Sequence, residues 1–229
     1  MSRRNMMAGK KAKEVKYGPL YNWYATQGTG NNSITSSDDW AVGDYTKWQT
    51  LFTNHSYNAL NLRTPDLLYW DNNSGINLFH FNSRGAGFRE ADGVFSSLKI
   101  TAFYWTSTNW DSTRAWMDGW TVSNPTTIFE LGAIDKRRGV SIRLFRQATI
   151  DEQMYIPNGA PCTPYTGNDR LLQYPTIRVG TQVWTACNLA ETKLRNGSLI
   201  PNITDNATWA GMTTIAMCDI NNNPNNTYM

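Results

Sequence analysis

Cysteines, histidines and paired carboxylates are the residues of this chain that could perform redox, metal or acid–base chemistry. Cys162, Cys187 and Cys218 are odd in number and form no CxxC motif, which excludes a dense disulfide framework and gives no zinc-type spacing. We expect buried free thiols, and one disulfide pair remains an alternative. His55 and His80 lie far apart without a metal-ligand pattern. The sequence therefore predicts neither a metal nor another cofactor.

The carboxylate pairs offer little support for catalysis. Asp38-Asp39 and Asp151-Glu152 stand in polar stretches. Carboxylates in such loops are usually solvated, whereas a general acid or base needs a pKa that burial or a neighbour has shifted. The sequence therefore predicts a protein that is not an enzyme.

Length and composition indicate a folded protein. The 229 residues include 10 Trp, 11 Tyr and 8 Phe, and 40% are hydrophobic, which is enough for one or two packed domains. No apolar run approaches the roughly 18–20 residues that span a bilayer. The basic N-terminus lacks the apolar region of a secretory signal. We therefore expect no membrane span, and synthesis in the cytoplasm.

The formal charge of +3 belongs to one terminal segment. Residues 1–16 carry six basic side chains and one acidic side chain, so the rest of the chain is slightly acidic. We interpret residues 1–16 as a basic arm that is solvated or attaches the protein to an assembly. Contact with nucleic acid is the alternative.

Two short amphipathic helices are predicted. The first follows an N-cap at Asp44 and reaches Phe52, because the spacing of its apolar residues is helical. The second lies within residues 204–212, with Thr204 or Asp205 as N-cap. The rest of the chain contains little helix.

Short β-prone segments supply the remaining structure. Residues 17–26, 103–108 and 140–146 have the composition or alternation of strands. In residues 176–189, Gly180-Thr181 separates two β-prone runs and suits a type II′ hairpin turn. The predicted fold class is mixed α+β.

Several short sequence motifs in the chain resemble the motifs of one protein family. Residues 177–214 resemble the opening of the Fibrobacter succinogenes major paralogous domain, with its "IGxQxWMAENL" hairpin and "DGxxIPNVTDNAAWA" segment. Residues 17–26, YGPLYNWYAT, are similar to the family's central "YGALYNWYA". Trp40 and Trp48 match its helix entry, and residues 104–108 and 139–143 resemble its "WWSST" and "GFSVR" strands.

The order of these parts departs from the family. There the hairpin-and-helix part precedes the YGALYNWYA part, whereas here residues 176–229 follow residues 17–146. Residues 147–175 contain four prolines and no sustained periodicity, which predicts a connector. The resemblance implies a circular permutation that closes within one chain, with adjacent termini. The alternative is that residues 176–229 complete a neighbouring chain.

The family is similar to the C-type lectin-like and formylglycine-generating-enzyme-like folds. Such a fold implies short twisted sheets, two short helices and a long-loop face that binds ligands. The corresponding stretch here runs from Asn109 to Asp135, and Trp and Arg in it are typical binding hot spots. The predicted ligand-binding residues are Trp110, Asp111, Arg114, Asp118, Trp120, Asn124 and Phe129.

Three other residues of this region receive different predictions. Trp105 and Trp116 match words that are buried in the family, so both are expected in the core. Asn109 could join nearby carboxylates in holding calcium, but no EPN-like or WND-like word is present. No calcium site is therefore predicted.

The resemblance implies a non-enzymatic recognition or structural protein. We expect a bacteriophage virion component, such as a tail or head fibre that binds a surface glycan or protein receptor of a Bacteroidetes-type host. Its other partners would be further virion proteins, bound through the basic arm, and copies of itself. A bacterial cell-surface adhesin-like domain is the alternative. A formylglycine-generating-type enzyme is disfavoured because the closing strand lacks a cysteine.

Overall fold

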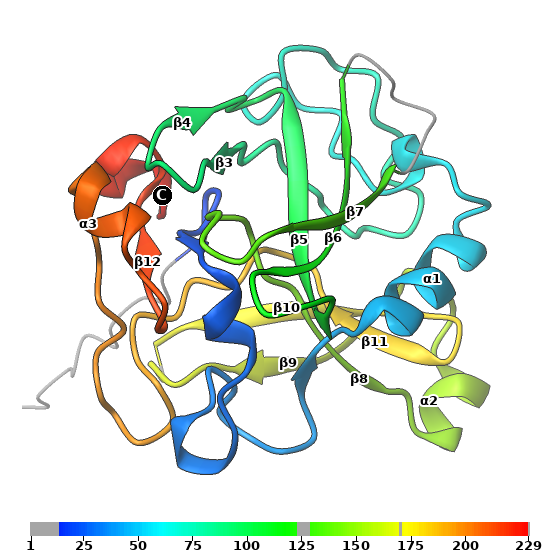
Figure 1. Ribbon diagram of the computed structural model, residues 1–229. Helices are drawn as coiled ribbons and strands as arrows, with labels where there is room; N and C mark the ends of the chain where they lie inside the picture. The colour runs from blue at the N-terminus through cyan, green and yellow to red at the C-terminus, as the bar shows by residue number, and fades with distance from the viewer. Residues whose placement is uncertain (1–13, 123–128, 170, 229) are drawn as a thin grey trace, which may run out of the picture.

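A five-stranded antiparallel sheet joins parts of the chain that are far apart in sequence (Figure 1). The structure is a computed structural model that describes residues 14–122, 129–169 and 171–228. The two central strands β11 and β10 form the predicted hairpin, and β11 pairs with β8 from the middle of the chain. In sheet order the strands are β2 (Ala41–Val42), β8 (Leu144–Gln147), β11 (Gln182–Thr185), β10 (Gln173–Val179) and β9 (Pro161–Thr166).

The geometry of the turn at Gly180-Thr181 confirms the predicted hairpin. Val179 pairs with Gln182, so two residues form the turn. Gly180 has φ +61°, the positive value that the first central position of a type II′ turn requires. The β-prone runs on either side therefore enter the sheet in the predicted register.

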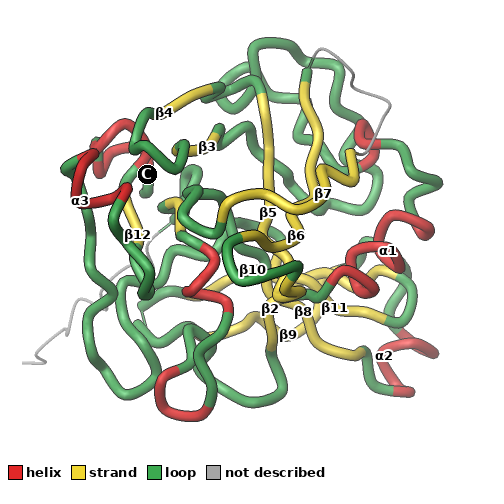
Figure 2. Tube along the Cα trace, in the orientation of Figure 1, coloured by secondary structure: helices red, strands yellow, loops and turns green. Residues whose placement is uncertain are grey.

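A second, three-stranded antiparallel sheet carries the predicted ligand face. It consists of β5 (Thr101–Asn109), β6 (Arg114–Thr121) and β7 (Phe129–Asp135), in that order. β5 contains the predicted strand 103–108, which is thus confirmed. Figure 2 shows that loops make up much of the remaining chain.

Two-stranded pairs complete the sheets. β1 (Leu20–Tyr21) pairs with β12 (Met217–Cys218), and β3 (Phe88–Arg89) pairs with β4 (Phe95–Ser96). The prediction of one strand over residues 17–26 is wrong in its second half, where Trp23–Thr26 forms a 3-10 helix. The Asn22 side chain accounts for the change, because it bonds to Ala216 N (3.1 Å) instead of extending a ladder.

The ends of the described chain lie side by side. Lys16 N donates to Thr227 O (2.9 Å), and Tyr17 N donates to Asn226 O (3.1 Å). Val15 forms an antiparallel bridge with Tyr228. The segments before and after residues 147–175 therefore meet within one chain, at the ends that the family order would join.

Both predicted helices are present and begin where expected. Helix α1 (Tyr45–Asn54) is capped by Asp44, whose carboxylate accepts from Lys47 N at 2.9 Å. Helix α3 (Asn206–Ala210) is capped by Asp205, which accepts from Thr208 N at 2.7 Å. These side chains satisfy backbone N–H groups that have no partner inside a helix. Single-turn 3-10 segments also occur at Gly30–Asn32, Ala59–Asn61, Ile220–Asn222 and Pro224–Asn226.

Residues 147–175, predicted as a connector without sustained periodicity, contain regular secondary structure. A third helix, α2 (Ile150–Tyr155), begins with a capping box in which Thr149 and Glu152 bond to each other's backbone N–H. Strand β9 follows and forms the outer edge of the five-stranded sheet. The edge position tolerates the prolines of β9, because their missing N–H groups can face away from the ladder.

The core is built from fully buried aromatic rings, and three arginines, Arg63, Arg89 and Arg143, are buried with them. The Trp48 ring stacks on Tyr104 (centroids 5.1 Å apart) and packs against Trp184 (4.8 Å). Arg143 is fully buried and donates to Asn188 Oδ1 (2.8 Å), Thr185 O (2.7 Å) and Phe81 O (2.9 Å). Val140, Ile142 and Leu144 are also buried, as the alternation of residues 140–146 predicts.

No helix in the described ranges combines the length and apolarity needed to cross a bilayer.

The paired ends lead to a prediction about chain order. A variant that links Tyr228 to Glu14 through a short Gly/Ser linker, and opens between Pro157 and Asn158, should fold to the same structure. The new loop joins segments that are already hydrogen-bonded, so its closure should change the unfolding free energy by no more than about 1–2 kcal/mol. Near-UV circular dichroism and urea unfolding of the two chain orders provide the measurement. A relinked chain without a cooperative transition would contradict the prediction.

Candidate functional site

The β5–β6 hairpin holds its connecting loop in a defined conformation. The Asp111 carboxylate accepts from Thr113 N (2.8 Å) and Arg114 N (2.8 Å) across the turn. The bond from Thr113, assisted by the Arg114 side chain, keeps the pKa of Asp111 well below its usual value. The loop is therefore exposed but ordered by its own side chain.

Charged groups fasten this loop from two sides. Arg114 donates to Asp111 Oδ2 through Nε (2.8 Å) and forms an ion pair with it through NH2 (2.7 Å). Lys136 is buried; it donates to Asp111 O (2.7 Å) and lies 4.4 Å from the centroid of the Trp23 ring. The guanidinium of Arg114 is thus held in place at the surface.

Three aromatic rings lie next to this loop, and we name them the aromatic patch: Tyr45, Trp110 and Trp116. Trp110 is 51% exposed, and its ring meets Trp116 edge-on with centroids 4.9 Å apart. Trp116 in turn packs against Tyr45 at 5.0 Å. Tyr45 and Trp116 are half-buried, so the patch combines a fixed base with an exposed edge.

Two of the predicted ligand-binding residues are buried, which is a correction. Trp120 is fully buried and packs against Tyr104 (5.3 Å) and Phe52 (6.5 Å). Asp118 is also fully buried, in register with Tyr104 of β5. The second half of β6 is covered on both faces, so neither side chain reaches an external ligand.

Trp110, Asp111 and Arg114 lie together at the exposed loop, as expected. Asn124 lies outside the described residues, and Phe129 is described only as a backbone paired with Gly119 at the start of β7.

The predictions that Trp105 and Trp116 are core residues have different outcomes. Trp105 is in the core as predicted, whereas Trp116 is half-exposed, so the prediction that Trp116 is a core residue is wrong. Tyr45 is the first residue of α1 and lies beside the β5–β6 hairpin, where its ring packs against Trp116. The position of Tyr45 at the first helical residue is the one sequence signal that could have separated it from the buried Trp48.

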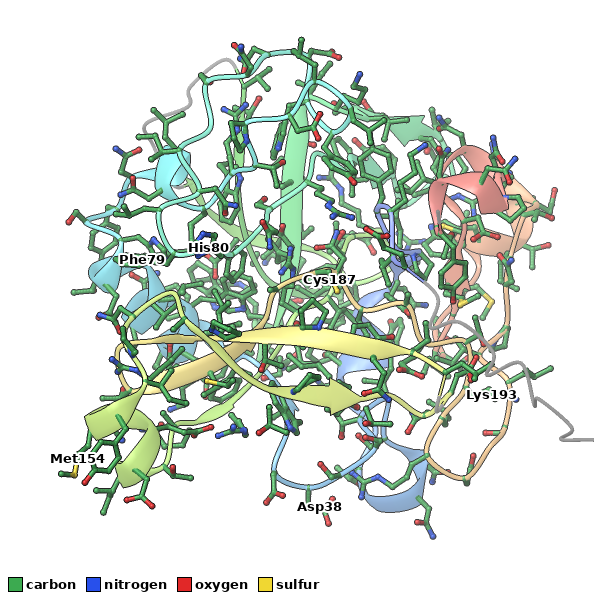
Figure 3. All side chains as sticks on the ribbon, turned by 180° about the vertical axis from the view of Figure 1, so that it is seen from behind. Asp38, Phe79, His80, Met154, Cys187 and Lys193 are labelled. Atoms are coloured by element: carbon green, nitrogen blue, oxygen red, sulfur yellow. The ribbon has the colours of Figure 1, made fainter. Side chains whose placement is uncertain are left out.

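All three cysteines are buried free thiols, which confirms the expectation. Burial raises the pKa of Cys187, and it raises that of Cys218 to about 12. Figure 3 shows Cys187 among the packed interior side chains, in contrast to Met154 at the outer surface of α2. Thiols with raised pKa values are poor nucleophiles at neutral pH.

The histidines do not form part of a cluster. His55 is buried against Phe79 (4.7 Å), and burial lowers its pKa to about 4. Among the residues that the structure describes, no group of three or more His, Cys, Asp or Glu is placed to hold a metal ion.

A buried carboxyl group, Glu191, was not predicted from the sequence. It is fully buried, accepts from the Tyr174 hydroxyl (2.9 Å) and from Asp169 N (3.2 Å), and has its pKa raised to about 7 by burial. Tyr21 donates to the backbone oxygen of the same residue at 2.7 Å. Because the surrounding groups come from distant segments, no local pattern could have identified it.

Comparisons with protein-family models, curated proteins and solved structures found no match to the chain.

Glu191 leads to a prediction about pH. Its pKa rises from 4.5 to about 7 on folding, so its contribution to stability is full below pH 4.5 and is lost as the pH rises through about 7. The unfolding free energy should therefore fall by about 2–3 kcal/mol between pH 5 and pH 8 on account of this group. Urea unfolding of the wild type and of Glu191→Gln across this range should show a flatter profile in the variant.

Glu152→Gln is the matched control. Its ion pair with Arg146 lowers the pKa of Glu152 to about 2, so this variant should shift the whole curve between pH 5 and pH 8 without changing its slope. If the unfolding free energy of Glu191→Gln falls with pH as steeply as that of the wild type, the prediction is wrong.

Proposed function

We propose that this protein is a non-enzymatic recognition protein, which binds a surface glycan or protein receptor of a host cell through the aromatic patch and Arg114. The single observation that carries the proposal is an exposed Trp110 ring fixed on the half-buried Trp116 at 4.9 Å. Contiguous exposed apolar surface, rather than a single exposed ring, often marks an interaction site, and the Trp110 ring continues onto Trp116 and Tyr45. Trp and Arg are also the residues most enriched at binding hot spots.

The order of the loop favours tight binding. The Asp111 carboxylate accepts from Thr113 N and Arg114 N, and Lys136 donates to Asp111 O, so the loop is fixed by its own chain. A receptor would therefore meet side chains whose freedom is already reduced, and binding would cost less entropy. The exposed guanidinium of Arg114 would orient a bound receptor, since a guanidinium donates hydrogen bonds in a fixed fork geometry.

The absence of an enzymatic role is part of the proposal. The buried, raised-pKa thiols of Cys187 and Cys218 support it, because a catalytic cysteine needs an accessible thiolate. The low pKa and burial of His55 support it as well.

The proposed identity rests on the resemblance described above. We propose that the chain is a circularly permuted relative of the Fibrobacter succinogenes major paralogous domain, with a C-type lectin-like fold. The hydrogen bonds of Lys16 and Tyr17 to residues 226–227 support the permuted order. In this proposal the protein is a bacteriophage virion component, a tail or head fibre, that assembles with its own copies and attaches to other virion proteins through residues 1–16.

Replacement of Trp110 by alanine tests the binding proposal. Trp110→Ala should weaken adsorption of the purified, fluorescently labelled protein to Bacteroidetes-type host cells at least tenfold, or about 1.4 kcal/mol or more. Tyr155→Ala is the matched control, because Tyr155 is a 74% exposed aromatic residue on α2 and is not part of the aromatic patch. Equal adsorption by Trp110→Ala, Arg114→Ala and the control would exclude the aromatic patch as the binding surface. Immunogold labelling of phage particles would separate a virion component from a cell-surface adhesin.

A further inference from the structure

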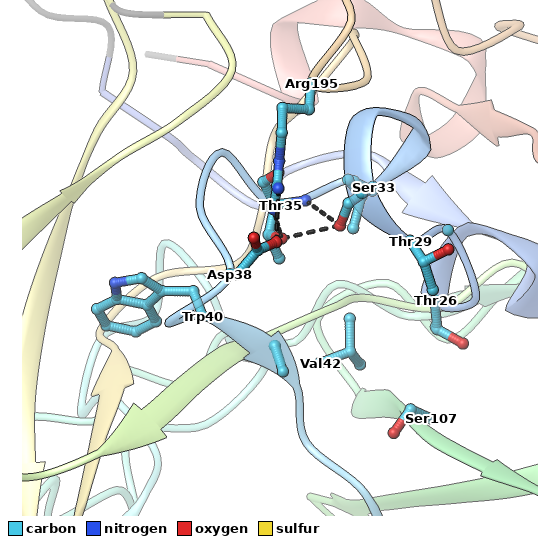
Figure 4. Close-up of a pocket in the computed structure, with 13 residues that line it drawn as sticks. Thr26, Thr29, Ser33, Thr35, Asp38, Trp40, Val42, Ser107 and Arg195 are labelled. Carbon is cyan, nitrogen blue, oxygen red and sulfur yellow. Dashed lines mark hydrogen bonds and ion pairs between the residues drawn. The ribbon is translucent and has the colours of Figure 1, made fainter.

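Figure 4 shows a pocket of about 300 Å³ near the N-terminal loops of the chain. Its walls are the loop from Thr26 to Thr35, strand β2, Ser107 of β5, and Arg195. Ser107 N donates to Gly43 O (3.0 Å), and Tyr45 N donates to Thr108 Oγ1 (2.9 Å). The pocket and the patch are therefore neighbours along the same two chain segments.

The charged groups of the pocket compensate each other. Arg195 NH1 donates to Asp38 Oδ1 at 2.6 Å, and its Nε donates to Thr35 O at 2.9 Å. NH2 donates to Thr35 Oγ1 at 3.2 Å. A guanidinium has five N–H donors, so two remain for a ligand. The neighbouring Asp38 carboxylate, which is mostly exposed, adds acceptors.

Hydroxyl groups supply most of the remaining polar lining. Ser33 and Thr35 share a hydrogen bond of 2.8 Å at the buried floor of the pocket. Within the described residues, neither Thr29 nor Ser107 makes a side-chain hydrogen bond. Each free hydroxyl can both donate and accept, and Val42 provides an apolar wall between these polar groups.

The frame of the pocket is assembled from two distant parts of the chain. Arg195 N donates to Ser33 O (2.9 Å), and Asn196 N donates to Asn31 O (2.9 Å). These bonds fix the loop that carries Thr29 against the segment that carries Arg195. The pocket is thus held together by backbone hydrogen bonds of the protein itself, and a preorganised site lowers the entropy cost of binding.

We propose that this pocket binds one neutral, polyhydroxylated molecule of the size of a single hexose. A volume of about 300 Å³ is at the small end of ligand sites. The compensated charge of Arg195 and Asp38 favours a neutral ligand over an anion or a cation. Donors next to acceptors fit adjacent ligand hydroxyls, each of which also donates and accepts. The inference is independent of whether the aromatic patch binds a receptor.

Isothermal titration and saturation-transfer NMR on the full chain test this inference. The probes are the methyl glycosides of glucose, galactose and mannose, with glucuronate and inorganic phosphate as charged probes. At least one neutral glycoside should bind, and both charged probes should bind at least tenfold more weakly. Thr29→Ala and Ser107→Ala should each weaken the neutral glycoside about two- to tenfold, the range for a neutral hydrogen bond.

Two further variants complete the test. Ala41→Trp should fill the pocket from an exposed position on its rim and abolish binding, with the thermal midpoint recorded to establish folding. Thr163→Ala removes an exposed hydroxyl from β9, outside the pocket, and should leave binding unchanged.

Several outcomes would overturn the inference: no neutral glycoside binds, phosphate or glucuronate binds more tightly, or binding survives in folded Ala41→Trp. Loss of glycoside binding in Trp110→Ala, with the pocket variants unaffected, would assign the sugar to the aromatic patch instead. Failure of cell adsorption with intact glycoside binding would reject the proposed function and leave the pocket inference standing.

Discussion

The burial of the Arg143 guanidinium is the constraint on which the rest of the fold depends. A charged group in the interior is tolerated only when its donors are paired, since an unpaired buried charge is far more costly than an unpaired neutral group. Here the partners are Thr185 O and Asn188 of the C-terminal segment and Phe81 O of the long loop region. The guanidinium carbon also lies 4.5 Å from the centroid of the Phe81 ring. One side chain therefore holds β8, the chain after β11 and a loop without regular structure in a single arrangement.

The two proposed binding surfaces depend on the packing of the core beneath them. Trp48 of α1 packs between Tyr104 and Trp184, so the start of α1 and the end of β5 are held at fixed positions relative to the core. Tyr45 and Ser107, at those two places, then belong to the aromatic patch and to the pocket. The surface is adaptable in sequence because it consists of loops and strand ends, but its geometry is determined by the buried rings beneath it.

The parts of the fold that could be predicted from sequence are those with local causes. The caps at Asp44 and Asp205 and the Gly180 turn each depend on a few consecutive residues. Asp44 and the turn were predicted, and Asp205 was one of two predicted candidates, with Thr204. The capping box of Thr149 and Glu152 is equally local, but the neighbouring prolines suggested a connector and hid it. Strand β9 was beyond local prediction, because its structure comes from pairing with β10.

The candidate site was predicted only in part, for a related reason. Simple alternation places Trp116, Asp118 and Trp120 on one face of β6, but the pairing with β7 shifts register between Trp116 and Asp118, and aromatic side chains cover the Trp120 end. Exposure along one strand thus depended on what packs over it. The pocket is formed by contacts between residues about 160 positions apart, such as Arg195 with Thr35. No sequence motif in the chain predicts these contacts.

The pairing of the two chain ends also has a mechanical consequence. Val15 pairs with Tyr228 and Leu20 pairs with Cys218 in antiparallel register, so both ends leave the ladder at the same side. A force that pulls the ends apart would load these hydrogen bonds one after another, as in opening a zipper. A force between Trp110 and one end would instead be shared by several strands of the core. The protein should therefore withstand more force when it is pulled between one end and Trp110 than when it is pulled between its two ends.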